Sequence, residues 1–391
     1  MTKLERLIEQ LCPDGVEYKE FGEIATISRG ASPRPIKAFL TNRENGVHWI
    51  KIGDVKTGEK YIESTEEFIT VEGAQKSRAV KKGDFILSNS MSFGRPYILK
   101  IDGYIHDGWL SISGFEKNLL SDFLYYVLNS TPIQAEMRKR ASFGGAVQNL
   151  NADIVRGLSL PVPPLEVQAE IVRILDKFTK LTTELTTELT NRKKQYEYYS
   201  RQLFVDAKNT QLTTLEQLSH NLDSQRQPVT SNKRTAGIYP YYGASGIVDY
   251  VDDYIFDGDY LLISEDGANL LARNTPIAFS ISGKSWVNNH AHVLKFDSYH
   301  TRRYVEIYIN SVDLSPYITG AAQPKLNQKN LNKIEIPLPP DEEQRRIVDI
   351  LDRFNKLCND ISEGLPAEIE SRQKQYEYYR DKLLSFKERV N

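Results

Sequence analysis

The chain has 391 residues, 40% hydrophobic and 26% charged, which is the composition of an ordinary globular protein with room for two or three domains. Its net charge of −2 gives no electrostatic argument for nucleic-acid binding. No stretch approaches the ~18 consecutive apolar residues of a membrane span, and the start lacks the apolar segment of a secretory signal, so a cytoplasmic protein is expected with no part in a membrane.

Residues 18–115 are predicted to form a β-rich domain. Short runs rich in β-branched and aromatic residues alternate with glycine turns, as in VHWIKIGD, DFILSNS, PYILKIDG and WLSISG. One helix is predicted near the end of this domain, around residues 119–128.

A long helix is expected to follow, from Gln168 to Phe204. Two prolines end the preceding strand, and Glu166 lies in the first turn, where it meets the positive end of the helix dipole. Apolar residues three and four apart form one narrow stripe, as in a coiled-coil seam. A helix of roughly 55 Å is too long to bury in one small domain, so we expect it to separate two domains and pack against a counterpart.

The second half of the chain repeats this order. Residues 238–296 carry the β-type runs IYPYYG, GIVDYV, YIF, DYLLIS, IAFSIS and HVLKF, and a helix is predicted around 302–309. A second long helix begins with three acidic residues, 341–343, and the stretch Gly364-Leu-Pro366 is expected to interrupt it.

The two halves are a tandem duplication of about 180 residues. LPVPPLEVQAEIVRILDKFTKL (160–181) aligns without gaps to IPLPPDEEQRRIVDILDRFNKL (336–357), and KQYEYY occurs at 194–199 and 374–379. The predicted fold is therefore α+β, with two β-rich mixed domains separated by two long antiparallel coiled-coil helices in a pseudo-two-fold repeat. The predicted boundaries are 1–157 and 209–333 for the β-rich domains, and 158–208 and 334–391 for the helical regions.

The sequence carries no recognisable catalytic motif. There is no GxxxxGK[ST] phosphate loop, and the Pro-Pro pairs lack the Asn/Asp and the aromatic residue of a methyltransferase motif. Asp14 and Glu17 resemble part of a nuclease motif but lie on one turn, which favours an exposed turn. His290 and His292 have metal-ligand spacing without an evident Cys or carboxylate partner, so a structural role is favoured and no metal is predicted. Cys12 and Cys358 are expected to be reduced thiols.

Loops rich in Arg, Lys, Asn, Gln and Ser are the candidate recognition surface, because these side chains read base edges and phosphates. For any one of them an ordinary solvated loop stays an equally good interpretation. The candidates are Arg29, Arg34, Lys37, Ser90, Ser92, Arg95, Arg138, Arg140, Gln148 and Asn149 in the first domain, and Lys233, Arg234, Tyr242, Lys284, Asn289, Gln323, Lys325 and Asn327 in the second. Several lie in GGAVQNLN (144–151) and its repeat GAAQPKLN (320–327), which could bind DNA or shape the approach to the helix.

The stripe residues are predicted to pair the helices or to dock partners. They are Ile174, Phe178, Leu181, Leu185, Leu189, Tyr196 and Tyr199 in the first copy, and Ile350, Phe354, Leu357, Ile361, Tyr376 and Tyr379 in the second. Tyrosines at helical spacing are usually packing residues, although their hydroxyls could reach a bound partner.

This pattern resembles the specificity (S) subunits of type I restriction-modification enzymes. The resemblance rests on the twin PLPPxxEQxxIVxILD(K/R)F blocks, the twin KQYEYY blocks and the opening LCPDGVEYKEFGEI, and it covers essentially the whole chain. The first block departs slightly, because Glu166-Val-Gln168 stands where the second has Glu343-Gln344.

The resemblance implies a non-catalytic subunit with two target-recognition domains, each reading one half of a bipartite double-stranded DNA site. Two methyltransferase (modification) subunits would dock on the helices, and restriction/translocase subunits would join through them. No cofactor is then expected in this chain, since S-adenosylmethionine, ATP and Mg would belong to the partner subunits.

A four-residue repeat, TTELTTEL (182–189), lies within the first long helix, and its copy number sets the DNA spacer length in a subclass of the family that the chain resembles. The alternatives are a coiled-coil scaffold whose two β-rich domains bind proteins, and a stand-alone DNA-cutting enzyme, which the missing catalytic motifs disfavour.

Overall fold

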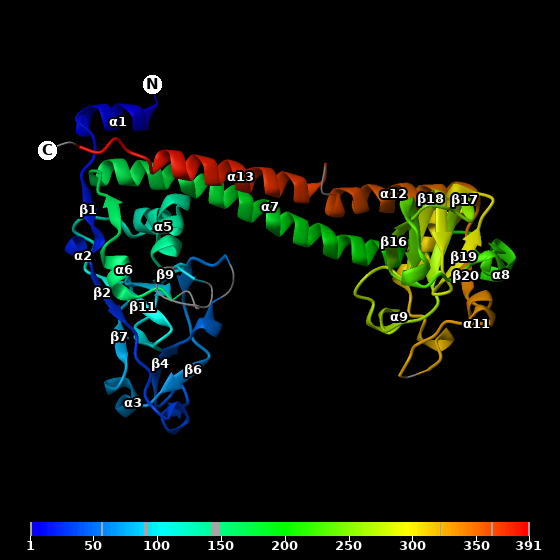
Figure 1. The fold of residues 1–391 in the computed structure, drawn as a ribbon, viewed down its shortest axis with the longest axis horizontal. Coiled ribbons are helices and arrows are strands. Elements are labelled where there is room, and N and C mark those ends of the chain that lie inside the picture. Colours follow the sequence, from blue (N-terminus) through cyan, green and yellow to red (C-terminus); the bar gives the residue numbers. More distant parts are fainter. Residues whose placement is uncertain are drawn as a thin grey trace. The chain divides into compact units, whose positions relative to one another are not determined.

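The computed structural model describes residues 2–55, 58–89, 93–141, 149–320, 322–360 and 363–389. It divides into two compact units, unit 1 with residues 1–184 and 369–391 and unit 2 with residues 185–368. Each unit contains one β-rich domain and parts of both helical regions (Figure 1). Within the described part of the chain, no helix combines the length and the apolar character needed to cross a membrane.

Unit 1 is built on two five-stranded sheets. The first has the order β2 (Thr26–Arg29), β11 (Trp109–Ser113), β8 (Phe85–Ser88), β9 (Pro96–Leu99) and β5 (Tyr61–Ile62). The second has the order β3 (Leu40–Thr41), β6 (Glu67–Ile69), β4 (Val47–Ile50), β10 (Gly103–Ile105) and β7 (Arg78–Val80). Its short helices are α1 (Lys3–Leu11), α2 (Phe21–Ile24), α3 (Val71–Gln75), α4 (Ser121–Asn129), α5 (Thr131–Ala141) and α6 (Ala152–Arg156).

The core of unit 1 lies on both faces of β8, which is buried along its whole length. Phe85 and Leu87 pack in the cluster that also holds the start of the long helix, whereas Ile86 packs with Trp109 in a second cluster. Burial on both faces explains why this strand is a continuous apolar run with no alternation of polar residues.

Unit 2 has one six-stranded sheet of the order β14 (His220–Asn221), β19 (Ala291–Lys295), β17 (Phe256–Ser264), β18 (Ala278–Val287), β15 (Ala236–Gly243) and β16 (Gly246–Val251). Its short helices are α8 (Leu215–Leu218), α9 (Asn269–Ala272), α10 (Tyr299–Ser311) and α11 (Gln328–Asn332). The strand β17 begins at Phe256, the last residue of the run YIF, and includes the whole run DYLLIS. It pairs with β18 without a break through Gly258, whose φ of +147° glycine tolerates easily.

A two-stranded sheet closes each domain where the chain enters and leaves it. In unit 1, β1 (Tyr18–Glu20) pairs with β12 (Ser159–Pro161), and in unit 2, β13 (Gln211–Thr214) pairs with β20 (Glu335–Leu338). Both pairs are antiparallel, and the second strand of each leads directly into a repeat helix. The duplication therefore includes the two-stranded sheet of each domain as well as the helix that follows it.

The repeat helices start with the same buried contact. Gln168 and Gln344, 176 residues apart, each donate from Nε2 to the carbonyl of a proline five residues earlier, Pro163 (2.7 Å) and Pro339 (2.8 Å). The Gln168 amide also bonds the backbone of Asn118 and Leu120, each at 2.8 Å. These glutamines fix the direction in which each helix leaves its domain.

The helical regions pair in an antiparallel fashion, as predicted. Each unit holds a part of the first region beside a part of the second. In unit 1 the first part of α7 (Leu165–Val205) packs beside α13 (Leu365–Leu383), and in unit 2 its second part packs beside α12 (Asp341–Asn359) (Figure 1). Phe178 stacks with Tyr379 at 5.4 Å between centroids, and Tyr199 lies 6.1 Å from Phe354. The predicted interruption is confirmed, since α12 ends at Asn359 and α13 begins at Leu365.

The structure gives the stripe residues different degrees of exposure. Leu181 and Leu357 are 37% and 39% exposed, whereas Leu175 and Leu351, absent from the prediction, are fully buried. The reason is that the first turns of each helix pack on their own β-rich domain, which buries a different face. Most other stripe residues are half-buried, namely Ile174, Phe178, Leu185, Leu189, Tyr196, Ile350, Phe354 and Tyr376, while Tyr199 and Tyr379 are exposed, and Ile361 lies outside the described residues.

Candidate nucleic-acid interface

Three loops meet at the carboxyl end of β8 in unit 1, and the buried residue Asn89 joins them. Its N–H donates to the carbonyl of Gly108 (3.1 Å), and its own carbonyl accepts from the N–H of Leu150 (2.8 Å). Its side-chain Nδ2 donates to the carbonyl of Asp107 (2.8 Å). We call residues 89, 106–108 and 149–150 the N-terminal loop junction.

The same frame occurs at the end of β17 in unit 2. The N–H of Glu265 donates to the carbonyl of His290 (2.8 Å), and the Glu265 carbonyl accepts from the N–H of Leu326 (2.7 Å). Positions 265 and 326 lie 176 residues after Asn89 and Leu150, the same offset as in the helices. We call residues 265–267, 288–290 and 322–326 the C-terminal loop junction.

Two arginines contact Asp107 at the N-terminal loop junction. Arg29 donates from Nε to the Asp107 carbonyl (3.3 Å), and the exposed Arg34 lies 3.4 Å from its carboxylate. The hydroxyl of Ser32 donates to that carboxylate (2.7 Å), and this bond lowers the pKa of Asp107. Both predicted arginines thus border the junction, with guanidinium groups available at its rim.

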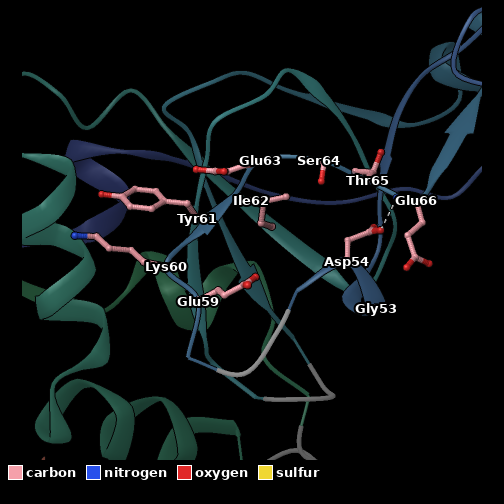
Figure 2. Close-up of a pocket in the computed structure, with 10 residues that line it drawn as sticks. All are labelled: Gly53, Asp54, Glu59, Lys60, Tyr61, Ile62, Glu63, Ser64, Thr65 and Glu66. Atoms are coloured by element: carbon pink, nitrogen blue, oxygen red, sulfur yellow. Dashed lines mark hydrogen bonds between the residues drawn. The ribbon is translucent and has the colours of Figure 1, made fainter. Parts of the chain in front are cut away.

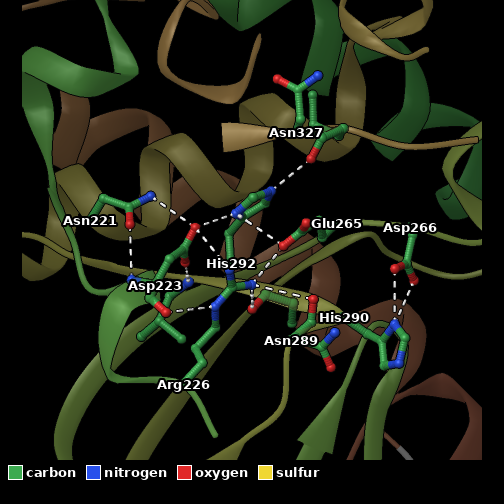
Figure 3. Close-up of polar contacts among 12 residues, drawn as sticks. Asn221, Asp223, Arg226, Glu265, Asp266, Asn289, His290, His292 and Asn327 are labelled. Atoms are coloured by element: carbon green, nitrogen blue, oxygen red, sulfur yellow. Dashed lines mark hydrogen bonds and ion pairs between the residues drawn. The ribbon is translucent and has the colours of Figure 1, made fainter. Parts of the chain in front are cut away.

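Opposite charges are packed beneath the C-terminal loop junction (Figure 3). The Nδ1 of His292 lies 2.6 Å from Asp223 Oδ2, and its Nε2 lies 2.7 Å from the carbonyl of Leu326. Glu265 contacts Arg226 at 2.7 Å and Lys325 at 3.1 Å.

The two carboxylates of this network are stabilised as anions. Burial alone would raise the pKa of Asp223 and of Glu265. The hydrogen bond with His292 nevertheless holds the pKa of Asp223 below its usual value, and the hydrogen bond with Arg226 does the same for Glu265. Both groups therefore carry their charge at neutral pH.

This network corrects the expectation that neither histidine has a carboxylate partner. Asp223 and Glu265 lie at His292, and Asp266 lies 2.9 Å from His290. This partner could not be predicted, because Asp223 is 69 residues from His292 and meets it only through the pairing of β14 with β19. Asp223, Glu265 and His292 offer a metal-type donor set within 4.8 Å, but Arg226 and Lys325 already neutralise its carboxylates.

The remaining candidates divide into surface groups and packing groups. Asn149 is exposed at the N-terminal junction, and Asn289, Gln323 and Lys325 are exposed at the C-terminal junction. Lys37 and Lys233 are exposed in short 3-10 helices elsewhere. Arg95 and Arg138 line a common hollow of about 480 Å³ in unit 1. Ser90, Ser92 and Gln148 lie outside the described residues.

Five candidates make contacts within the fold itself. Arg140 bonds the carbonyl of Gly157 (2.7 Å), and Arg234 bonds Asp249 (3.1 Å) while covering the ring of Tyr241. Lys284 lies over the ring of Tyr254, and the Tyr242 carbonyl accepts from the N–H of Asn288. Asn327 caps α11 by accepting from the N–H of Asn330 (3.0 Å), as Asn151 caps α6, which favours the structural interpretation for the shared Leu-Asn of the two loops.

A second hollow in unit 1 has the wrong charge for a polyanion. It has a volume of about 550 Å³ and is lined by residues 53–54 and 59–66 (Figure 2). Four of these described residues are acidic, Asp54, Glu59, Glu63 and Glu66, and the lysine described among them, Lys60, is paired with Asp122 at 2.5 Å. Phosphates would be repelled here, so the loop junctions are the better candidates for the interface.

The comparisons with known proteins follow this duplicated architecture. A family model described as the type I restriction modification DNA specificity domain matches residues 13–194 and, a second time, residues 208–371. The chain belongs to the family of type I restriction-modification specificity subunits. In this specificity subunit each loop junction falls inside one matched segment.

Curated relatives carry the same description. A putative type I restriction enzyme specificity subunit of Haemophilus influenzae is 37% identical over 178 residues, and that alignment spans about half of each chain, 44% here and 46% of the relative. The EcoR124I/EcoR124II specificity subunit of Escherichia coli is 33% identical over 301 residues, 69% of this chain and 72% of the relative. The EcoprrI specificity subunit of Escherichia coli is 26% identical over 93% of this chain and 92% of its own.

Solved structures share the fold over almost the whole length. The S subunit from M. genitalium has a TM-score of 0.53 at 14% identity, covering 95% of this chain and 96% of its own. A chain from a type I R-M system, studied for complex assembly and conformational transition, has a TM-score of 0.64 at 16% identity, covering 95% and 97%. These likenesses confirm the architecture of two mixed domains with long helices.

Sequence reasoning missed Asn89, Asp107, Asp223 and Glu265. A signal for two of them was present, because the strand runs DFILSN and DYLLISE keep the offset of 176 up to Asn89 and Glu265. Asp107 and Asp223 had no such signal, since their places depend on which strands pair.

Proposed function

We propose that this specificity subunit reads an asymmetric DNA site in two halves, one with each loop junction, and that it carries out no chemistry of its own. The observation that supports this most directly is the contrast between the junctions. Their backbone frame is the same, but Asn89 and Asp107 stand in one where Glu265 and Asn289 stand in the other. A shared frame with different side chains suits two different base sequences.

Phosphate contacts must then be local or shared with partners. The net charge of −2 cannot attract a duplex by itself. Exposed cations lie at the rim of the junctions, such as Arg34 with a side chain 82% exposed and Lys325 at 51%. We expect weak binding by the isolated chain and tight, specific binding in the complex.

The helices support the docking of two identical partners. Tyr198 and Tyr378 are 61% and 60% exposed, and Leu181 and Leu357 are 37% and 39% exposed. Each pair occupies equivalent positions in the two copies, so the same apolar groups are presented twice. Two such surfaces fit two modification subunits, through which restriction subunits would join. S-adenosylmethionine, ATP and Mg would be held by these partner subunits.

Selection from a pool of random duplexes tests DNA reading. The purified chain is mixed with its modification subunits, and the bound duplexes are sequenced. We expect one enriched sequence made of two unlike halves around a fixed spacer. If no sequence is enriched even with the partners present, the proposal is wrong and a protein-binding scaffold is the better interpretation.

Alanine variants at Tyr198 and Tyr378 test docking. Each single variant should weaken one of two modification-subunit sites about tenfold, and the double variant should weaken both. Analytical ultracentrifugation gives the number of subunits bound. Tyr250→Ala is the matched control, because Tyr250 is 51% exposed but lies on β16, outside the repeated helices. Equal binding by the double variant and the native chain would contradict this docking surface.

A further inference from the structure

His292 is fully buried, and both of its ring nitrogens face hydrogen-bond acceptors. Nδ1 lies 2.6 Å from the carboxylate of Asp223, and Nε2 lies 2.7 Å from the carbonyl of Leu326. A neutral imidazole has a single N–H and could satisfy only one of these acceptors. The geometry therefore requires the imidazolium, which donates to both.

Two neighbouring carboxylates balance the positive charge of the imidazolium. Asp223, from the turn after β14, is the direct counter-ion, and Glu265, at the end of β17, lies 3.8 Å away. Arg226 bridges the two carboxylates at 3.4 and 2.7 Å, and Lys325 contacts Glu265 at 3.1 Å. Three cations and two anions thus share one site, and the cation at its centre is His292.

The imidazolium is hydrogen-bonded to the backbone of a loop of the C-terminal loop junction, at Leu326. Leu326 is held from two sides, because its carbonyl accepts from His292 and its N–H donates to the Glu265 carbonyl. The preceding residue, Lys325, pairs in the backbone with Thr319 at 2.7 and 2.8 Å. Exposed Gln323 lies within that closed loop. The position of the loop therefore depends on the bonds at Leu326.

Among the described residues of the N-terminal junction, this ionic arrangement is absent. His292 stands opposite Ile263 in the sheet of unit 2, and Leu110 stands opposite Leu87 in unit 1. Leu87 and Ile263 are 176 residues apart, so Leu110 occupies the place of His292. Leu110 is fully buried in an apolar cluster, and no ionic contact is available from its side chain.

We propose that His292 is a positioning residue for only one half of the DNA site, the half read by the C-terminal loop junction. Its imidazolium fixes the loop that carries Gln323 and Lys325, and the sequence preference at that half depends on this contact. The inference rests on the proposed function, since it concerns how one of the two halves is read.

The test uses the full chain with its modification subunits and a pool of random duplexes. His292→Leu installs the residue found at the equivalent place in unit 1. We expect the enrichment of one half-site to fall about tenfold or more, the size of one or two lost base contacts, while the other half is enriched as before. His220→Leu, at an exposed histidine of β14 in the same sheet, is the control and should change neither half.

A second variant, His292→Gln, gives a readout that does not depend on leucine being tolerated in this buried place. Its side-chain amide N–H can still donate to the Leu326 carbonyl, whereas leucine offers no donor. The preference at the C-terminal half should therefore be kept in part, while the other half stays as in the unaltered chain.

The outcomes separate the two levels of the proposal. If the unaltered complex enriches no two-part sequence, the proposed function itself fails. If it does, but His292→Leu keeps both halves or a folded His292→Leu loses both, the role of His292 is wrong. Should His292→Leu unfold, a folded His292→Gln that weakens both halves equally would overturn the role in the same way.

Discussion

The ring of Phe178 stacks on the ring of Tyr379 with 5.4 Å between centroids and 26° between planes. Its counterpart is the contact of Phe354 with Tyr199, at 6.1 Å and 35°. Each pair joins the ILD(K/R)F block of one copy to the KQYEYY block of the other. An ILD(K/R)F block thus packs against a KQYEYY block twice, once in unit 1 and once in unit 2. This repeated contact explains why both blocks are alike in the two copies.

Tyr379→Ala should therefore lower the stability of unit 1, and Tyr199→Ala should lower that of unit 2. We expect the free energy of unfolding to fall by about 1 kcal/mol, the value of an aromatic pair with part of its buried area. Urea denaturation gives the total, and hydrogen exchange shows which unit opens. Tyr378→Ala, at a ring 60% exposed, should cost less than half as much. A larger loss at Tyr378 than at Tyr379 would show that this stacking does not hold the helices.

Leucine at Gln168 should destabilise unit 1 by about 2 to 3 kcal/mol. The buried amide bonds two carbonyls and one N–H, at Pro163, Asn118 and Leu120, and all three would lose their partner. The chemical denaturation midpoint measures the effect. Gln195→Leu, at an exposed position of the same helix, is expected to stay within about 0.5 kcal/mol of the native chain. Comparable effects at the two positions would contradict the anchoring role of Gln168.

Glu170 should make unit 1 sensitive to strong acid. The hydrogen bond from Arg173, together with one from Lys3, lowers the pKa of this buried carboxyl from 4.5 to about 2. A lowered pKa stabilises the fold above pH 4.5, and this contribution is lost as the pH falls toward 2.

The expected loss is about 1 to 2 kcal/mol, since the side chains of Arg173 and Lys3 are largely exposed and solvent screens them. Glu170→Gln should lower the melting temperature at pH 7 and flatten its decline between about pH 5 and about pH 2. An unchanged acid profile in this variant would assign the acid sensitivity to other carboxyls.

Deleting one TTEL unit should shorten the DNA spacer. The boundary between the two compact units falls at residues 184 and 185, within the repeat 182–189, and α7 is helical throughout this stretch. Four residues span about 6 Å of helix, compared with 3.4 Å per base step. Selection from random duplexes should give a spacer one to two base pairs shorter with both half-sites unchanged. The same spacer after deletion would contradict a measuring role for this helix.

Much of the fold could be predicted because its signals are local or repeated. Phe85–Ser88 and Phe256–Ser264 are strands whose apolar runs are visible in the chain, and the helix starts at residues 165 and 341 follow from proline pairs and acidic first turns. The exposed places of Leu181 and Leu357 could not be predicted, because periodicity marks an apolar face without saying whether a domain or a partner covers it.

The sequence by itself determined the duplication, because self-similarity at a constant offset is a property of the chain alone. It links Gln168 with Gln344, and Asn89 with Glu265. Only the tertiary structure decided that Asp223 meets His292 and that Leu110 stands in the corresponding place of unit 1. Those neighbours depend on strand order and register, which long-range packing sets and which no local spacing of residues encodes.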